Sequence, residues 1–145
     1  MNWMLALPEI VLACAGLAIL MFGVLPRQNM FFGCTMASIG ALVVTAALVL
    51  TVPDGVAFGG QVISDGFARF VKILVLLGAA IGMLLALDFN TREQMDRFEY
   101  PVLLLFATLG MLILVGANDF MTVYIGLELL SLSLYVVAAV SYTHL

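Results

Sequence analysis

Residues 120–140 read FMTVYIGLELLSLSLYVVAAV, an apolar run that contains a single charge, the carboxylate of Glu128. A transmembrane α-helix needs roughly 20 mostly apolar residues, so this run is long enough to cross a bilayer. A charged side chain at the centre of a membrane helix costs about 2.5 to 3.5 kcal/mol on insertion scales. The run therefore predicts a membrane helix whose carboxylate is kept by an ion pair, by protonation or by a water-filled interior.

The composition of the whole chain also indicates a membrane protein. Of its 145 residues, 65% are hydrophobic and 10% are charged, whereas soluble domains average about 45 to 50% apolar and about 25% charged residues. The formal net charge is −4, and Lys and Arg together number five. With so few basic residues and no basic patch, the chain is not expected to bind nucleic acid.

Four further apolar runs precede this one and are separated by short polar breaks. The expected spans are residues 5–25, 30–52, 67–87, 101–117 and 120–140. Glycines in the connection over residues 54–66 argue against a regular element there. Pro101 suits the first turn of a helix, and Asn118-Asp119 can cap the last one. Barrel strands would alternate over only about ten residues, so we expect an all-α, polytopic transmembrane bundle of five spans.

The basic residues of the connections predict how this bundle is oriented. Three of them follow the first and third spans: Arg27, Arg92 and Arg97. The other two, Arg69 and Lys72, lie at the start of the third span, on the opposite side. Because short loops rich in Lys and Arg favour the cytoplasm, the N-terminus is expected on the outer side. The short connections also make consecutive spans antiparallel neighbours.

The first and third spans carry smaller features that predict local packing. Gly78 and Gly82 form a G-x-x-x-G pair, which lets another helix approach closely, although small residues are also common in membrane helices generally. Glu9 and Lys72 each lie about one turn inside a span, from where both are expected to snorkel to the membrane interface. Lys72 is therefore not expected to pair with Glu128, which lies near the middle of the membrane.

Hydroxyl side chains share a helix face with Glu128. Positions i−4, i+3 and i+7 lie on the same face as i, and here they are occupied by Tyr124, Ser131 and Tyr135. Loss of solvation raises the proton affinity of a carboxylate and a nearby lysine lowers it, so a group between these effects changes protonation when a charge moves. Glu128 is thus predicted to be a proton relay with the three hydroxyls as its polar surroundings. The alternative is a buried acid that only fixes helix packing.

Cofactor sites have no ligand set in this sequence. Cys14 and Cys34 do not form a C-x-x-C pair and are interpreted as small buried side chains, and His144 is the only histidine. Zinc, haem and iron–sulfur sites are therefore not expected. No G-x-G-x-x-G or P-loop occurs either, so no nucleotide site is expected.

The sequence over residues 116–135, GANDFMTVYIGLELLSLSLY, resembles the fifth-helix region of a known family. The family comprises the antiporter-like membrane subunits of proton-translocating NADH:quinone oxidoreductase (respiratory complex I), and chain N is the most similar. The shared pattern is an Ala-Asn turn, then Gly-x-Glu-Leu-x-Ser-Leu and an aromatic residue. Asp65-Gly66-Phe67-Ala68 and Phe98-Glu99-Tyr100 resemble the same family, so the match covers most of the chain from residue 65 onward.

The resemblance implies a membrane-arm subunit that couples electron transfer from NADH to quinone with proton transport. Glu128 would match the family's fifth-helix acid, which pairs with a lysine on a later helix. NADH, FMN, iron–sulfur clusters and quinone would belong to other subunits, with no cofactor in this chain. The implied partners are other membrane-arm subunits, especially neighbouring antiporter-like chains, and the lipid bilayer.

The resemblance also implies a location and a longer gene product. The family's N-terminus is periplasmic, in agreement with the loop charges, and the lack of a transit peptide favours a bacterial inner membrane over a mitochondrial one. Family members have about fourteen helices, so the chain is interpreted as the N-terminal part of a longer polypeptide.

Two other functions are compatible with the sequence. Subunits of multisubunit cation/proton antiporters, which are not driven by redox chemistry, share the same glutamate. A small structural membrane protein without a transport role would use Glu128 only for packing. Lysines on downstream apolar helices would favour the two transport functions, and co-purified redox subunits would separate them. We predict the function in complex I.

Overall fold

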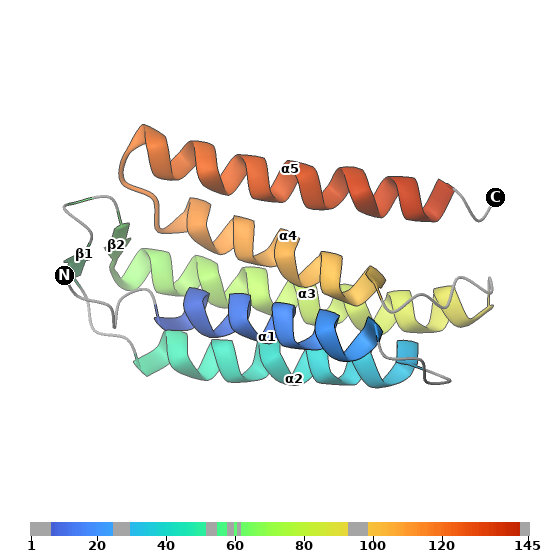
Figure 1. The fold of residues 1–145 in the computed structure, drawn as a ribbon. Helices are drawn as coiled ribbons and strands as arrows, with labels where there is room; N and C mark the ends of the chain where they lie inside the picture. The colour runs from blue at the N-terminus through green and yellow to red at the C-terminus, as the bar shows by residue number, and fades with distance from the viewer. Residues whose placement is uncertain are drawn as a thin grey trace.

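The computed structural model describes residues 7–24, 30–51, 55–57, 60, 62–92 and 99–142. Within these residues the chain forms helices and one β-hairpin (Figure 1). In chain order they are α1 (Leu7–Val24), α2 (Met30–Thr51), β1 (Gly55–Ala57), β2 (Val62–Ser64), α3 (Gly66–Arg92), α4 (Glu99–Val115) and α5 (Phe120–Tyr142). The predicted helical class is confirmed, and consecutive helices pack on one another as expected.

Two of the described helices are long and apolar enough to cross a membrane. These stretches are Gly66–Leu85 and Phe120–Ala139, with mean hydropathies of 2.1 and 1.8. Shorter apolar helical stretches occupy Leu7–Met21, Thr35–Thr51 and Pro101–Val115. Five membrane crossings therefore stay a prediction. Helix α3 continues to Arg92, beyond its predicted end at residue 87, because a helix can extend through polar residues after its apolar run has ended.

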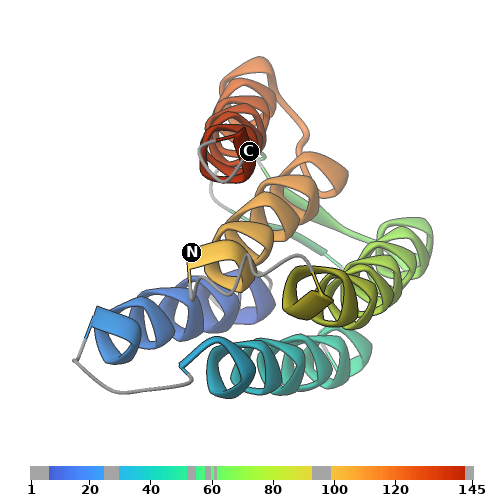
Figure 2. The same ribbon diagram turned by 90° about the vertical axis from the view of Figure 1, so that its right-hand side faces the viewer.

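Helix α4 lies at the centre of the bundle. In the end-on view of Figure 2, α1, α2 and α3 lie to one side of α4 and α5 lies on the other. Helix α4 packs on all four other helices, whereas α5 packs chiefly on α4. The buried core is aliphatic apart from one methionine, and it comes from α1 to α4: Leu12, Ile19, Leu42, Val49, Leu76, Met83, Val102, Leu105, Leu109 and Leu112.

Local signals begin three of the helices. Asp65 precedes α3, and its Oδ1 accepts a hydrogen bond from the Ala68 amide at 2.7 Å. Asp119 precedes α5, and its Oδ1 accepts one from the Thr122 amide at 2.9 Å. Each carboxylate satisfies an N–H group that has no partner inside the first turn of its helix. Pro101 lies in the first turn of α4, as predicted.

The connection between α2 and α3 is more regular than expected. The prediction of an irregular loop over residues 54–66 was wrong, because β1 and β2 pair antiparallel with Gly55 opposite Ser64 and Ala57 opposite Val62. Gly60, with a φ of 91°, lies in the turn between them. Glycine adopts such a positive φ without a steric penalty. Gly60 therefore allows the tight turn of a hairpin, and it does not indicate an irregular loop.

Helices α4 and α5 approach each other most closely at two glycines. A Cβ atom placed on Gly110 would lie 2.8 Å from the backbone nitrogen of Leu130, and one on Gly126 would lie 2.9 Å from Cγ of Leu114. The predicted close approach at Gly78 and Gly82 is absent, since a Cβ on either would meet no described atom within 4 Å. Both of these α3 glycines are exposed, because α3 turns other residues toward its neighbours.

Candidate functional site

The polar face of α5 lies opposite the face that packs on α4. Thr122, Gly126 and Ser133 are the buried residues of α5. Each residue turns an α-helix by about 100°, so Glu128 lies roughly 200° around the helix from Gly126. Glu128 is exposed, as are Tyr124 and Tyr135, with exposed fractions of 62% and 69%. Helix α5 therefore turns its carboxylate away from the bundle.

The four predicted site residues do lie on one face, as the helical spacing requires. Tyr124, Glu128 and Tyr135 are exposed there, and Ser131 at the same face is partly buried. Among the residues that the structure describes, none forms a hydrogen bond or an ion pair with Glu128. The shared face with Tyr124, Ser131 and Tyr135 is present, but its relay role stays a prediction.

Glu9 and Lys72 form a buried ion pair at one end of the bundle. Lys72 Nζ donates a hydrogen bond to Glu9 Oε1 at 2.6 Å, and their side chains are 5% and 13% exposed. The expectation that both side chains snorkel to an interface was wrong, because each charge is compensated by the other and does not need water. Alternate helices of an antiparallel bundle start at the same end, so two charges one turn inside α1 and α3 were a signal for this pairing.

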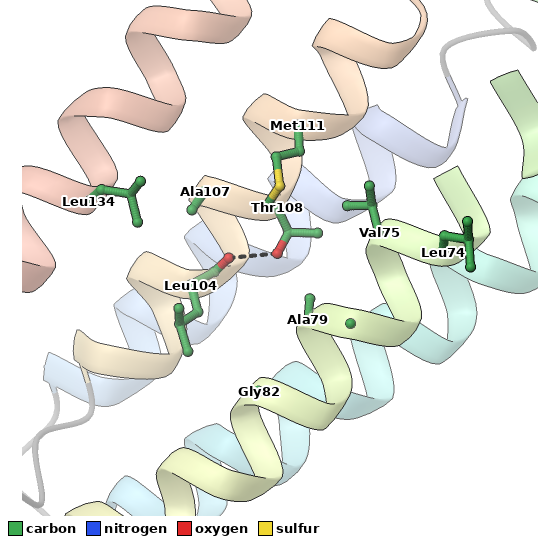
Figure 3. A pocket seen from close by; sticks show the side chains of 10 residues that line it. Leu74, Val75, Ala79, Gly82, Leu104, Ala107, Thr108, Met111 and Leu134 are labelled. Carbon is green, nitrogen blue, oxygen red and sulfur yellow. Dashed lines mark hydrogen bonds between the residues drawn. The ribbon is translucent and has the colours of Figure 1, made fainter. Parts of the chain in front are cut away.

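An apolar pocket of about 430 Å³ lies between α3 and α4 and reaches α5 (Figure 3). Its lining consists of small and aliphatic residues with one methionine and one threonine: Leu74, Val75, Gly78, Ala79, Gly82, Leu104, Ala107, Thr108, Met111 and Leu134. The hydroxyl of Thr108 donates to the carbonyl oxygen of Leu104 at 2.8 Å. Because that hydroxyl already has a partner and no ionisable group lines the pocket, the pocket offers no group for chemistry.

No metal site is formed by the described residues, since no three His, Cys, Asp or Glu side chains come together there. Cys14 is exposed, so its predicted burial was wrong. The buried face of α1 runs through Leu12, Gly16 and Ile19, and Cys14 lies between these positions on the other side. The side chains of Cys34 and His144 lie outside what the structure describes.

Several curated proteins similar to this chain are named NADH-quinone oxidoreductase subunit N. The chain is 51% identical over 140 residues to NADH-quinone oxidoreductase subunit N of Granulibacter bethesdensis, covering 96% of this chain and 29% of that protein. It is 49% identical to subunit N of Gluconacetobacter diazotrophicus, covering 96% of this chain and 30% of that protein. The chain is a homologue of subunit N. No family model matches it.

The similarity to subunit N extends beyond the motifs quoted from the second half of the sequence. Subunit N of Parvibaculum lavamentivorans is 45% identical over 136 residues, which cover 92% of this chain and 28% of that protein. The first two helices therefore belong to the matched region as well. The chain spans less than a third of the length of these curated relatives. Subunit N relatives from bacteria and two long apolar helices together indicate a membrane protein.

Proposed function

We propose that this chain is part of a membrane-arm subunit of a proton-translocating NADH:quinone oxidoreductase, in which Glu128 is the relay carboxylate. The observation that carries the proposal is the position of this single charge within an apolar helix, on a face with three hydroxyl residues. The curated relatives bear the name of the redox-driven complex, which favours this function over that of a cation/proton antiporter subunit.

The uncovered face of α5 supports a role inside a larger protein. A carboxylate facing lipid at this depth would cost about 2.5 to 3.5 kcal/mol on insertion scales. The matched relatives are more than three times as long as this chain, so further helices are available to cover Glu128, Tyr124 and Tyr135. Such helices would supply the polar or basic groups that α1 to α4 do not, in line with the lysine that the family resemblance implies.

In this function the chain contributes proton handling and no redox chemistry. As a relay, Glu128 would exchange a proton with water or with basic groups supplied by the rest of the complex. The hydroxyls of Tyr124, Ser131 and Tyr135 donate to the ionised carboxylate or hold water beside it. NADH, FMN, the iron–sulfur clusters and quinone would bind to other subunits of the complex. The direct partners of this chain would be neighbouring antiporter-like chains of the membrane arm and the lipid bilayer. The complex lies in a bacterial inner membrane, with the start of α1 on the periplasmic side.

The test is Glu128→Gln in the full-length subunit within the assembled complex. Glutamine keeps the size and polarity of the side chain but cannot release a proton, so proton pumping and coupled NADH–quinone turnover are expected to fall several-fold. Pumping is measured as acidification of the interior of inverted membrane vesicles, and turnover as the rate of NADH oxidation with added quinone. Unchanged pumping and turnover in a correctly assembled variant would refute the relay role.

Three milder variants serve as controls for that experiment. Glu128→Asp retains a titratable carboxylate and is expected to lose less activity than the glutamine variant. Tyr124→Phe and Ser131→Ala remove one hydroxyl each, and their effects are expected to be smaller still, because water can replace a hydroxyl. Equal losses in all four variants would indicate a disturbed α5 rather than a lost proton site.

A further inference from the structure

The buried ion pair between Glu9 and Lys72 lies beside the turn that leads into α5. A Cβ atom placed on Gly116 would lie 3.4 Å from Lys72 Nζ and 3.3 Å from the carbonyl oxygen of Ile63. The lysine ammonium thus donates to the Glu9 carboxylate on α1 and lies near Gly116 in the turn that follows α4. The ion pair that joins α1 to α3 therefore lies close to the turn between α4 and α5.

The β-hairpin binds the same turn through two hydrogen bonds. The Ile63 amide donates a hydrogen bond to the Gly116 carbonyl oxygen at 2.8 Å. The Asn118 side-chain amide donates one to the Gly60 carbonyl oxygen, also at 2.8 Å. Figure 1 shows the hairpin at the end of the bundle where α3 begins and α4 turns into α5. We call Glu9, Lys72, the hairpin and residues 116–118 the junction.

Helix α5 depends on this junction because its other support comes from one helix. It packs chiefly on α4 and turns the face with Glu128 away from the bundle. The contact with α4 holds α5 on one side, and a fixed turn at its first residue adds a second restraint on its translation and rotation. Asp119, which caps α5, follows the junction directly.

We propose that Glu9 and Lys72 are positioning residues for Glu128, because their ion pair fixes the turn from which α5 starts. The importance given to Glu128 rests on the proposed function, whereas the geometry of the junction does not depend on that function. One carboxylate oxygen of Glu9, Oε2, is buried without a hydrogen-bond partner among the described residues. Lys72 donates to the other carboxylate oxygen of Glu9, and loss of either partner leaves the other charge buried.

The competing explanation is that the pair itself takes up and releases protons. The two explanations differ in what happens when both charges are removed together. A positioning pair can be replaced by two apolar side chains of similar volume. The double variant buries no charge, whereas each single variant leaves one buried charge without its partner, which costs more free energy. A pair that handles protons cannot be replaced in this way.

The experiment compares Glu9→Leu, Lys72→Met and the double variant in the full-length subunit within the assembled complex. Each single variant is expected to lower coupled turnover and pumping about three-fold or more, and the double variant to return within about two-fold of the unaltered protein. A double variant that is as impaired as the singles would overturn the proposal. Single variants with unaltered turnover would overturn it as well.

A distance measurement reports on the junction without reference to proton transport. Spin labels at Ile10 on α1 and Met121 on α5, both exposed positions, give a distance distribution by double electron–electron resonance. The distribution is expected to broaden in each single variant and to narrow again in the double variant. Unchanged distributions in the single variants would contradict the proposal. If the label distances change in the Glu9 and Lys72 variants but Glu128→Gln pumps normally, the proposed function is refuted. The positioning of α5 by the ion pair is then still supported.

Gly116→Ala perturbs the junction while it retains both charges. It replaces Glu9→Leu or Lys72→Met in the experiment if either variant fails to assemble into the complex. Its methyl group would lie 3.4 Å from Lys72 Nζ and 3.3 Å from the Ile63 oxygen, so the lysine or the hairpin must shift. Broader label distances and lower turnover are expected. The matched control is Gly40→Ala on α2, which meets no described atom within 4 Å and is expected to change neither. Equal behaviour of the two alanine variants would overturn the proposal.

Discussion

The substitution Gly110→Ala tests the packing that holds α5 to the bundle. The new methyl carbon would lie 2.8 Å from the Leu130 nitrogen and 2.9 Å from the Gly126 oxygen, where an ordinary contact begins near 3.4 Å. Both neighbours are backbone atoms and cannot rotate away, so α4 and α5 must separate by about 0.6 Å. A gap of roughly that size forfeits about a quarter of the dispersion energy of each contact along the interface.

The expected cost of this substitution combines two opposing effects. Overpacking of a well-packed interface costs about 1 to 3 kcal/mol, and the rigid neighbours put Gly110→Ala at about the upper end of that range. Alanine recovers about 0.5 to 1 kcal/mol because glycine is the poorer helix former. We therefore expect the free energy of unfolding to fall by about 2 kcal/mol.

The assay is thermal unfolding of the purified full-length protein in detergent, followed by circular dichroism at a helix band. Gly40→Ala is the matched control, because its methyl group meets no described atom within 4 Å and only the gain in helix propensity applies. The melting temperature is expected to fall for Gly110→Ala and to stay constant or rise for Gly40→Ala. A Gly110→Ala protein that melts at or above the unaltered temperature would refute the close approach of α4 and α5.

Two further substitutions test local features of the chain. Asp119→Ala removes the cap that accepts from the Thr122 amide and is expected to lower the free energy of unfolding by about 1 kcal/mol, measured in the same melt. Asp119→Asn should retain most of the stability, and equal melting of all three proteins would contradict the capping role. Gly60→Ala places a Cβ on a residue with a φ of 91° and is expected to cost about 1 to 2 kcal/mol. The effect is expected as faster hydrogen exchange of the Ile63 amide, which donates to the Gly116 carbonyl oxygen. Unchanged exchange would contradict the strained turn.

Much of the helical framework could be predicted because its signals are local. Apolar runs located the helices, although α3 extends beyond its run, and Asp119 marked the start of α5 through a hydrogen bond within a single turn. Pro101 marked the first turn of α4, where a missing amide hydrogen is tolerated. The shared face of Tyr124, Glu128 and Tyr135 also followed from the period of 3.6 residues, which any α-helix imposes. The similarity to subunit N rested on the same stretch of sequence and was confirmed over nearly the whole chain.

Contacts between distant segments were predicted poorly. Lys72 was expected at an interface but pairs with Glu9, which lies 63 residues away. The close approach of helices was expected at Gly78 and Gly82 on α3, whereas it occurs at Gly110 and Gly126. A pair of glycines indicates that another helix can approach closely at that position. Which face of the helix contacts a neighbour depends on how all the helices are rotated in the bundle.

The sequence by itself thus determined most of the helical segments, the cap of α5 and the face on which Glu128 lies, since hydrogen bonds and periodicity within a few residues decide these features. Only the tertiary structure decided that this face points away from α4, and that Glu9 and Lys72 meet near the turn into α5. The physical reason is that rotation and depth of a helix depend on the sum of many weak packing contacts. No single residue pattern encodes that sum.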